Sequence, residues 1–343
     1  MNSDAGGTRR RVNISDVARE AGVSPTTVSH ALNGRGQVDL RTRKRVESAA
    51  AKLGYRPNRH AQRLRTGEAH MIALLSSMPF AIAGGPSRLG FLMEIAAVAA
   101  TAALTRGLAL VLAPPMENGA VPLELLDVDG ALVVEPSAHD PNIEVLQQRG
   151  LPVVAIGRQP GSGNTVPFVD IHSAETTQRL LDHLDAQGAR RVAMVLGSAQ
   201  RNSYLEAEAT YRAAVDRRGA PCLLVRADEQ QGEAGGYQAT MALLSGHPDI
   251  DAFCVPVDAF AVGTVRALHD AGRRIPQDVM VVTRYDGLRA QTCEPPLTAI
   301  DMCLEQTANL AVDLLFEHLR GDGTTRSVSG PETRLVPRAS SLR

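Results

Sequence analysis

The side chains best suited to a chemical task are concentrated in the first 67 residues, where basic residues greatly outnumber acidic ones. This segment holds 14 of the 36 Lys and Arg residues but only 5 of the 37 Asp and Glu residues, a net charge of +9. The rest of the chain then carries −10, because the whole chain carries −1. A basic segment joined to an acidic body predicts a module that binds a polyanion, attached to a soluble partner domain.

Residue patterns typical of catalysis or metal binding are absent from the sequence. No strand is followed by G-x-G-x-x-G, and the chain contains no G-x-x-x-x-G-K-[ST], G-x-S-x-G or H-E-x-x-H. The nine histidines do not cluster at ligand spacing, and the four cysteines form no C-x-x-C pair, which fits a reducing cytosol. We therefore expect no enzyme activity, no cofactor and no metal site.

Three short helices are expected to position the basic and hydroxyl side chains. Asn13, Ser24 and Asp39 stand at N-cap positions, while Gly22 and Gly54 stand where a first and a third helix would end. The outer face of the second helix is left with Thr26, Thr27, Ser29, His30 and Asn33. Small hydrogen-bonding side chains on a helix that follows a tight turn are typical of a helix-turn-helix. An ordinary three-helix bundle with a charged surface is the alternative.

Two strings of residues resemble the DNA-binding segment of the lactose and galactose repressor (LacI/GalR) family. They are ISDVAREAGVSPTTVSHALNG (14–34) and RTRKRVESAAAKLGYRPNRHAQRLRTG (41–67). The family's D-V-A, A-G-V-S, T-V-S, L-G-Y-x-P-N and A-x-x-L follow one another in order between Asp16 and Leu64. The resemblance implies a flexible basic arm at 1–11, a helix-turn-helix at 12–57 that binds duplex DNA, and a hinge helix or linker at 58–67.

The resemblance also implies roles for single side chains. Pro25 and Thr26 fall where family members read bases, and His30 stands at a position often held by Arg, a stronger guanine reader. Leu64 matches the hinge residue that enters the minor groove and kinks the duplex, with plain packing as its alternative role. The implied DNA-binding set is Ser24, Pro25, Thr26, Thr27, Ser29, His30, Asn33, Asn58, Arg59, Ala61, Arg63 and Leu64.

From Ala69 onward, short apolar runs alternate with helical stretches. Runs such as RVAMVLGS (191–198) and VMVVTRY (279–285) are continuous in apolar residues, which indicates parallel strands covered on both faces. Such units are too numerous for one sheet, so we expect two α/β lobes over residues 68–343. The longest apolar stretch, 91–104, contains Glu94 and is too short to span a bilayer. The N-terminus does not read as an export signal.

This body resembles, more loosely, the family's ligand-binding and dimerisation domain, which is akin to periplasmic sugar-binding proteins. The resemblance implies two lobes, a chain that crosses between them more than once, and an effector bound in the cleft. The sequence departs from the sugar-binding members at three places. Ala207 stands where they carry Arg, Val257 where they carry Asn or Ser, and 283–286 reads TRYD in place of Gly-Tyr/Phe-Asp-Asp.

Ligands of open α/β lobes bind beyond the carboxyl ends of the strands. That rule selects Ser76, Ser77, Arg158, Asp258, Arg284, Tyr285 and Asp286 as candidate effector contacts. A structural role is an equal alternative for each of them. In that case Arg158 would pair with Asp258 or Asp286 across the cleft.

The sequence therefore predicts a cytoplasmic homodimer, with a tetramer as the alternative, that binds palindromic DNA as a ligand-responsive transcription repressor. We expect its effector to be a sugar, a nucleoside or a related metabolite, and we expect no membrane partner. Two other classes of protein are the alternatives: a small-molecule binding or transport protein of the same two-lobed fold, and an α/β enzyme with an attached DNA-binding module. The intact N-terminal module counts against the first, and the missing catalytic motifs count against the second.

Overall fold

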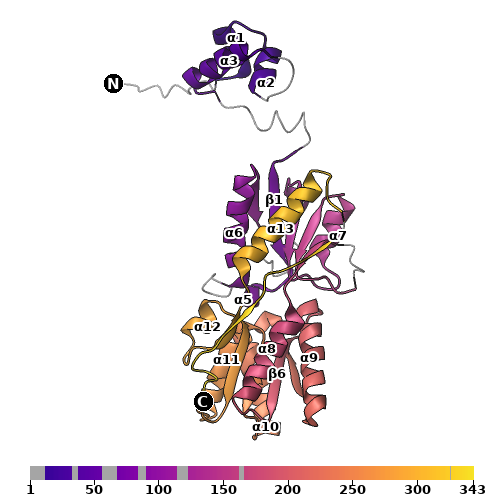
Figure 1. Ribbon diagram of the computed structural model, residues 1–343, viewed down its shortest axis with the longest axis vertical. Coiled ribbons are helices and arrows are strands. Elements are labelled where there is room, and N and C mark those ends of the chain that lie inside the picture. The colour runs from indigo at the N-terminus through magenta and orange to yellow at the C-terminus, as the bar shows by residue number, and fades with distance from the viewer. Residues whose placement is uncertain are drawn as a thin grey trace, which may run out of the picture. The chain divides into compact units, whose positions relative to one another are not determined.

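The structure, a computed structural model, describes residues 12–32, 38–55, 68–83, 90–113, 123–161, 166–324 and 326–343. The chain divides into two compact units, Met1–Glu68 and Ala69–Arg343 (Figure 1). A helical first unit and a two-sheet α/β second unit confirm the fold class that the sequence predicts. Within the described residues, no helix is long and apolar enough to cross a membrane.

The first unit contains three helices, α1 (Ile14–Ala21), α2 (Pro25–Leu32) and α3 (Leu40–Leu53). Asn13 caps α1 by accepting hydrogen bonds from the amides of Ser15 and Asp16, and the side chain of Asp16 accepts one from the Asn13 amide in return. Gly22 ends α1 in the left-handed conformation, at φ +64°. Each helix contributes small apolar side chains to one core, formed by Val17, Ala18, Ala21, Val28, Ala31, Val46, Ala49 and Ala50.

The second unit begins with a parallel sheet of six strands, ordered β11-β5-β4-β3-β1-β2. The strands are β1 (Met71–Ser76), β2 (Ala109–Leu112), β3 (Gly130–Val134), β4 (Val153–Ile156), β5 (Phe168–Asp170) and β11 (Ser327–Ser329). Helices α6 (Phe91–Thr105) and α13 (Leu304–Leu319) pack together and contact strands of this sheet. Helix α7 (Pro141–Gln148) packs on β3 and β4 with residues of a separate apolar cluster, so both faces of the sheet are covered. The 3-10 helix Leu123–Leu125 and helix α5 (Phe80–Ala83) complete this first lobe.

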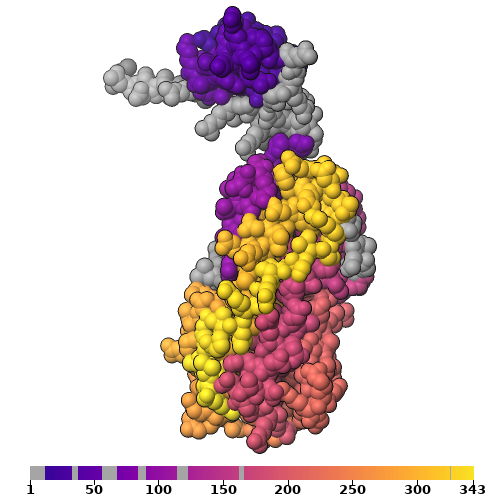
Figure 2. Space-filling view, viewed as in Figure 1, coloured from indigo at the N-terminus to yellow at the C-terminus, as the bar shows by residue number. Residues whose placement is uncertain are grey.

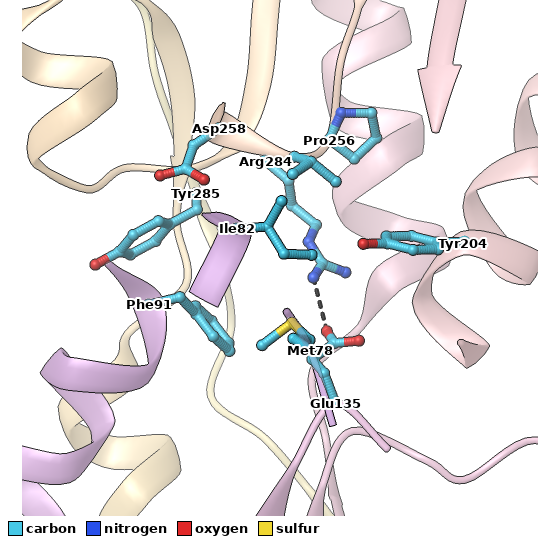
Figure 3. Close-up of a pocket in the computed structure, with 10 residues that line it drawn as sticks. Met78, Ile82, Phe91, Glu135, Tyr204, Pro256, Asp258, Arg284 and Tyr285 are labelled. Atoms are coloured by element: carbon cyan, nitrogen blue, oxygen red, sulfur yellow. Dashed lines mark hydrogen bonds and ion pairs between the residues drawn. The ribbon is translucent and has the colours of Figure 1, made fainter. Parts of the chain in front are cut away.

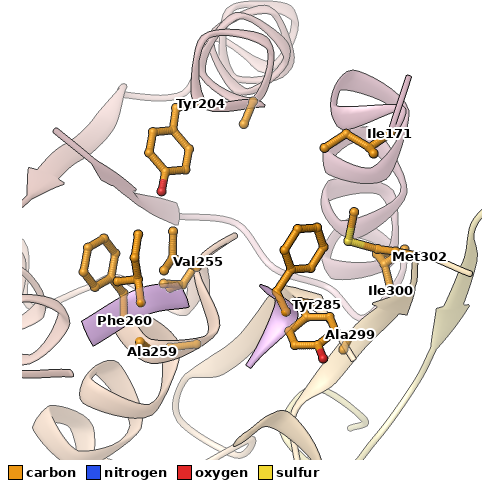
Figure 4. Packing of buried hydrophobic residues seen from close by; sticks show 14 of the residues in the cluster. Ile171, Tyr204, Val255, Ala259, Phe260, Tyr285, Ala299, Ile300 and Met302 are labelled. Carbon is orange, nitrogen blue, oxygen red and sulfur yellow. The ribbon is translucent and has the colours of Figure 1, made fainter. Parts of the chain in front are cut away.

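The second lobe has another six-stranded sheet, ordered β12-β10-β9-β8-β6-β7. Its strands are β6 (Val192–Gly197), β7 (Leu223–Ala227), β8 (Ala252–Cys254), β9 (Met280–Tyr285), β10 (Thr298–Asp301) and β12 (Arg334–Val336). All neighbours are parallel except β12, which runs antiparallel to β10. Its helices are α8 (Ser173–Ala186), α9 (Asn202–Arg218), α10 (Glu233–Gly246), α11 (Asp258–Asp270) and α12 (Leu288–Thr292), with the 3-10 helix Glu229–Gln231. Helices α8 and α9 pack together, as do α10 and α11, and Figure 4 shows part of the buried apolar packing.

The chain crosses between the lobes three times, after β5, after β10 and after β11. His172 and Cys303 lie at the first two crossings with φ near +50°, and each amide donates to an aspartate two residues earlier. Gly330 lies at the third crossing, where an added Cβ would come within 2.2 Å of the Asp170 carbonyl oxygen. The first and third crossings are therefore close together, and the C-terminal segment extends over both lobes on the face seen in Figure 2.

Candidate functional site

The first candidate site is the outer surface of α2. The Ser24 hydroxyl accepts a hydrogen bond from the Thr27 amide at 3.1 Å and lies 2.9 Å from the Thr27 hydroxyl, so these two side chains hold the start of the helix. Val28 and Ala31 are buried against the other two helices. Pro25, Thr26 and His30 remain exposed, while Thr27 and Ser29 are half-buried. The helix therefore offers a short polar face that a DNA groove could receive.

Basic side chains lie on α3, beside this helix in the same unit. Arg41, Lys44 and Arg45 are exposed, whereas Val46 of the same helix is fully buried. Long cationic side chains on the exposed face of a small domain suit contacts with phosphates. The other members of the predicted DNA-binding set, Asn33, Asn58, Arg59, Ala61, Arg63 and Leu64, lie outside the described residues, as do the whole predicted arm and the whole predicted hinge.

The second candidate site is a pocket between the two lobes, shown in Figure 3. The first lobe lines it with Met78, Ile82, Phe91 and Glu135, and the second lobe lines it with Tyr204, Pro256, Val257, Asp258, Arg284 and Tyr285. Its volume is about 450 Å³ when the space open to solvent is included. Two carboxylates and one guanidinium therefore share the pocket with three aromatic rings and several aliphatic side chains.

Arg201, just before α9, connects the lobes and contacts Glu135, a residue that lines the pocket. Its guanidinium donates to Glu229 of its own lobe at 3.1 and 3.2 Å. From the same position it donates to the hydroxyl and carbonyl oxygens of Ser77 at 3.0 and 3.2 Å and to the carbonyl oxygen of Glu135 at 2.5 Å, all in the first lobe. The Arg201 side chain is only 2% exposed, so these partners must replace the water that would otherwise stabilise its charge.

Glu135, at the carboxyl end of β3, is the residue of the first lobe that makes several contacts with the second lobe. One carboxylate oxygen accepts from Arg284 of β9 at 2.7 Å, and the other accepts from the Ser203 hydroxyl of α9 at 2.6 Å. Figure 3 shows Arg284 extending toward Glu135. Arg284 also donates to Ser173 at 2.9 Å. The Arg284 Nε is buried without a hydrogen-bond partner among the described residues, so it can donate to a bound molecule.

A second set of contacts joins the lobes at the opposite side of the pocket. Arg289 of α12 lies 3.3 Å from both carboxylate oxygens of Asp258 and also donates to the carbonyl oxygens of Ala81 and Ile82 in α5. Tyr285 donates to Glu94 of α6 at 2.5 Å, and its ring meets that of Phe91 edge to face. These contacts connect α5 and α6 of the first lobe to the second lobe.

Burial raises the pKa of several groups around the pocket. It raises the pKa of the Asp258 carboxyl, although the neighbouring Arg289 opposes that change. Burial, together with the neighbouring Glu229, raises the pKa of Tyr204 well above its ordinary value. Burial and the hydrogen bond to Glu94 do the same for Tyr285. Both phenols are therefore neutral at physiological pH and act as hydrogen-bond donors.

The structure brings only some of the predicted effector contacts into this pocket. Asp258, Arg284 and Tyr285 line it, whereas Ser77 does not line it and instead accepts a hydrogen bond from Arg201. Ser76 is buried and donates to the Val134 carbonyl oxygen, which makes it a part of the first sheet.

The remaining two predicted contacts lie away from the pocket. Arg158 is exposed and its guanidinium stacks 5.1 Å from the centre of the Phe168 ring. Asp286 pairs with Arg338. The predicted ion pair of Arg158 with Asp258 or Asp286 is therefore wrong, because Asp258 pairs with Arg289 and Asp286 with Arg338, each within the second lobe.

Sequence reasoning missed five charged or aromatic residues of this site, namely Phe91, Glu135, Arg201, Tyr204 and Arg289. A usable signal existed for two of them. Glu135 directly follows β3 and Arg201 follows β6 by four residues, so the rule about carboxyl ends of strands could have selected both. No group of three or more His, Cys, Asp or Glu side chains that could hold a metal ion occurs in the described parts of the chain.

Comparison with known proteins agrees with the geometry of both sites. Residues 13–58 match a family described as bacterial regulatory proteins, lacI family, and residues 181–341 match a periplasmic binding protein-like domain. The chain is 31% identical to the HTH-type transcriptional regulator CelR of Thermobifida fusca, over 97% of this chain and 99% of that one. It is 30% identical to the ribose operon repressor of Escherichia coli K12, over 89% and 92% of the two chains. These relatives are regulators rather than enzymes.

Solved structures extend the likeness over the whole chain. A CelR complex with cellobiose superimposes with a TM-score of 0.69 at 30% identity and covers 96% of this chain and 100% of the other. A lac repressor dimer bound to operator and an anti-inducer superimposes with a TM-score of 0.79 at 26% identity and covers 97% and 100%. The chain therefore belongs to the LacI family of bacterial regulatory proteins and is a ligand-controlled, DNA-binding transcription regulator.

Proposed function

We propose that the protein is a repressor that binds a palindromic DNA site as a homodimer in the cytoplasm, and that a small molecule held between its lobes controls this binding. The proposal that the protein binds DNA rests mainly on helix α2, whose start is capped. Because Ser24 and Thr27 hold its start, Thr26 and His30 stand on its exposed face in a fixed orientation. A two-fold symmetric protein dimer favours a two-fold symmetric site.

We further propose the domain limits and the remaining DNA contacts that the resemblance implies. In this proposal residues 1–11 form a basic arm, 12–57 the helix-turn-helix, 58–67 a hinge and 68–343 the ligand-binding and dimerisation domain. The hinge places Leu64 in the minor groove, with Arg59 and Arg63 on flanking phosphates. The basic composition of residues 1–67 supports this arrangement.

Selection from a random library of DNA duplexes, with the full chain as the bait, tests the DNA-binding proposal. We expect the recovered sequences to share a palindrome, and we expect Thr26→Ala to relax the preference at one position of each half-site. Arg190→Gln, on the exposed surface of the second unit, is the control and should recover the same palindrome. Recovery of asymmetric sequences, or of no consensus, would contradict the proposal.

For the effector we propose a small neutral molecule with polar groups and an apolar face, such as a sugar or a nucleoside. Each guanidinium at the cleft already has a carboxylate partner: Arg201 has Glu229, Arg284 has Glu135 and Arg289 has Asp258. An anionic ligand would lose its hydration without meeting a free cation among these three, which is costly in a buried site. The rings of Phe91, Tyr204 and Tyr285 supply the apolar walls.

A thermal-shift screen with matched pairs of compounds tests the ligand class. A ligand that binds only the folded protein raises its melting temperature. Each pair contains a neutral compound and its phosphate ester, for example glucose with glucose 6-phosphate and adenosine with AMP. We expect stabilisation by a neutral member and none by its ester. Stabilisation by the ester alone would refute the neutral class, whatever the protein does with DNA.

A further inference from the structure

On the Arg201 side of the pocket, buried charged and hydroxyl side chains connect the two lobes. Five residues make these contacts, and we call them the interlobe latch: Ser77 and Glu135 of the first lobe, and Arg201, Ser203 and Arg284 of the second. Ser77 accepts from Arg201 alone, through its hydroxyl and its carbonyl oxygen, whereas Glu135 contacts three residues of the second lobe. Its two carboxylate oxygens and its carbonyl oxygen each accept from a different residue of the second lobe.

The charged groups of the latch are almost completely removed from solvent. The side chains of Arg201, Glu135 and Arg284 are 2%, 5% and 11% exposed. Charge pairs attract strongly where water is scarce, and each unpaired charge would be costly there. If the lobes moved apart, water could replace the partners that are lost. The charged groups of the latch thus have hydrogen-bond partners in two states. In the closed state the partners are protein groups, and in the open state they are water molecules. Few intermediate states of the two lobes would be stable.

The backbone at Glu135 is also unusual. Its φ is +49°, in the left-handed region that residues other than glycine rarely adopt. Such a conformation persists where the surroundings fix the residue firmly, and it is often found at functional positions. Here the three interlobe hydrogen bonds of Glu135 fix both ends of the residue. The local conformation and the interlobe contacts therefore support each other.

We propose that the interlobe latch closes the cleft in the absence of an effector, with Glu135 as its central residue. The ligand-free protein is then mainly closed, and an effector enters only when the latch opens, instead of pulling two open lobes together. This inference goes beyond the proposed function, since it concerns the free protein and needs neither DNA nor a known effector.

Hydrogen exchange at the Ala138 amide reports directly on closure. This amide, in the first lobe, donates to the carbonyl oxygen of Gln200 in the second lobe at 2.9 Å, so it loses its acceptor when the lobes separate. Exchange is measured by mass spectrometry on the full chain without DNA or added ligand. We expect the Ala138 amide to be protected in the unmodified protein, and we expect Glu135→Gln to speed its exchange at least tenfold.

A matched control variant separates opening of the cleft from general destabilisation. Glu208→Gln is the same substitution at a carboxylate that also pairs with two arginines, Arg212 and Arg226, but all three lie in the second lobe. It should leave exchange at Ala138 unchanged. The Leu223 amide, which donates to the buried Tyr211 hydroxyl, should keep its protection in both variants.

Two further variants keep the proposal testable if Glu135→Gln fails to fold. Ser203→Ala removes a single latch contact and should speed exchange at Ala138 by less than Glu135→Gln. The double variant Glu135→Gln/Arg284→Gln leaves no buried charge unpaired between these two positions, so it should open the cleft less than the sum of the single changes. Rapid exchange at Ala138 in the unmodified protein, or equal acceleration by Glu208→Gln, would overturn the proposal.

Discussion

Replacing Arg201 by Met is the most informative single test of how the second unit is held together. Methionine keeps a long flexible side chain but has no donor for the contacts that Arg201 makes. Those contacts are two hydrogen bonds to Glu229, two to Ser77 and one to the Glu135 carbonyl oxygen. The substitution therefore affects both the interior of the second lobe and its connection to the first.

The expected cost follows from the carboxylate that the substitution leaves behind. Glu229 has a side chain only 5% exposed, so its charge would remain buried without a cation. Removal of one partner from a buried ion pair costs about 3–5 kcal/mol. Because a domain is stable by only about 5–15 kcal/mol, Arg201→Met should remove a large part of the free energy of unfolding of the second unit.

The companion variant isolates the electrostatic part of that cost. Arg201→Met combined with Glu229→Gln removes both charges, and neutral replacement of a buried pair is often nearly neutral in stability. We expect the double variant to recover at least about half of the loss caused by Arg201→Met alone. Glu208→Gln, at a more exposed carboxylate of the same lobe, should cost no more than about 1 kcal/mol.

Urea denaturation followed by far-ultraviolet circular dichroism measures these differences. Urea is preferred to guanidinium because it is uncharged and does not screen ion pairs. Protein concentration is held constant, since association of subunits would otherwise shift the transition. A loss below about 1 kcal/mol for Arg201→Met would show that Glu229 is solvated or protonated in the folded protein. A double variant no more stable than Arg201→Met would show that lost packing, and not charge, is the cause.

Three other predictions concern DNA binding and pH. Ser24→Ala should lower the stability of the first unit by about 1 kcal/mol through loss of the helix cap, and should weaken binding to all DNA sequences alike; Thr26→Ala should instead cost about 1–3 kcal/mol of discrimination at one operator position. Competition assays with matched and mismatched operators separate the two effects, and equal weakening by Thr26→Ala would contradict its role in base reading. Leu64→Ala should abolish most operator bending, measured by the mobility of circularly permuted DNA fragments, while sedimentation of the free protein stays unchanged. Burial raises the folded-state pKa of Asp258, so its contribution to stability is greatest below the unfolded pKa of about 3.9 and falls as the pH rises through the folded value. Stability of Asp258→Asn relative to the unmodified protein should therefore increase between about pH 4 and pH 7, and a constant difference would contradict that shift.

The helical unit could be predicted closely because its signals are local. Asn13, Gly22 and Asp39 each act within one helix turn, and all three have the capping role that their residue types indicate. The longer buried strands of the body were equally clear, since each is a continuous apolar run. Local signals of this kind depend little on the rest of the fold.

Elements defined by distant partners were harder to predict. Strand β11 has three residues, two of them exposed serines, and exists because it pairs with β5, more than 150 residues earlier in the chain. Helix α7 is short, and only its Asp140 cap and the proline that follows mark its start. Pattern reasoning over a single stretch of sequence has no access to such pairing.

The same limitation explains why Arg284 was selected as a candidate but its partner was not. The sequence offered Asp258 and Asp286 as carboxylates near the ends of strands, and both are paired with arginines of their own lobe, Arg289 and Arg338. Arg284 instead pairs with Glu135, which lies 149 residues away in the other lobe. Which carboxylate Arg284 meets thus depends on which ones the neighbouring arginines already occupy. An ion pair between the lobes is therefore a consequence of the complete set of pairings, and a change at Arg289 or Arg338 should alter the partner available to Arg284 as well as the local contact.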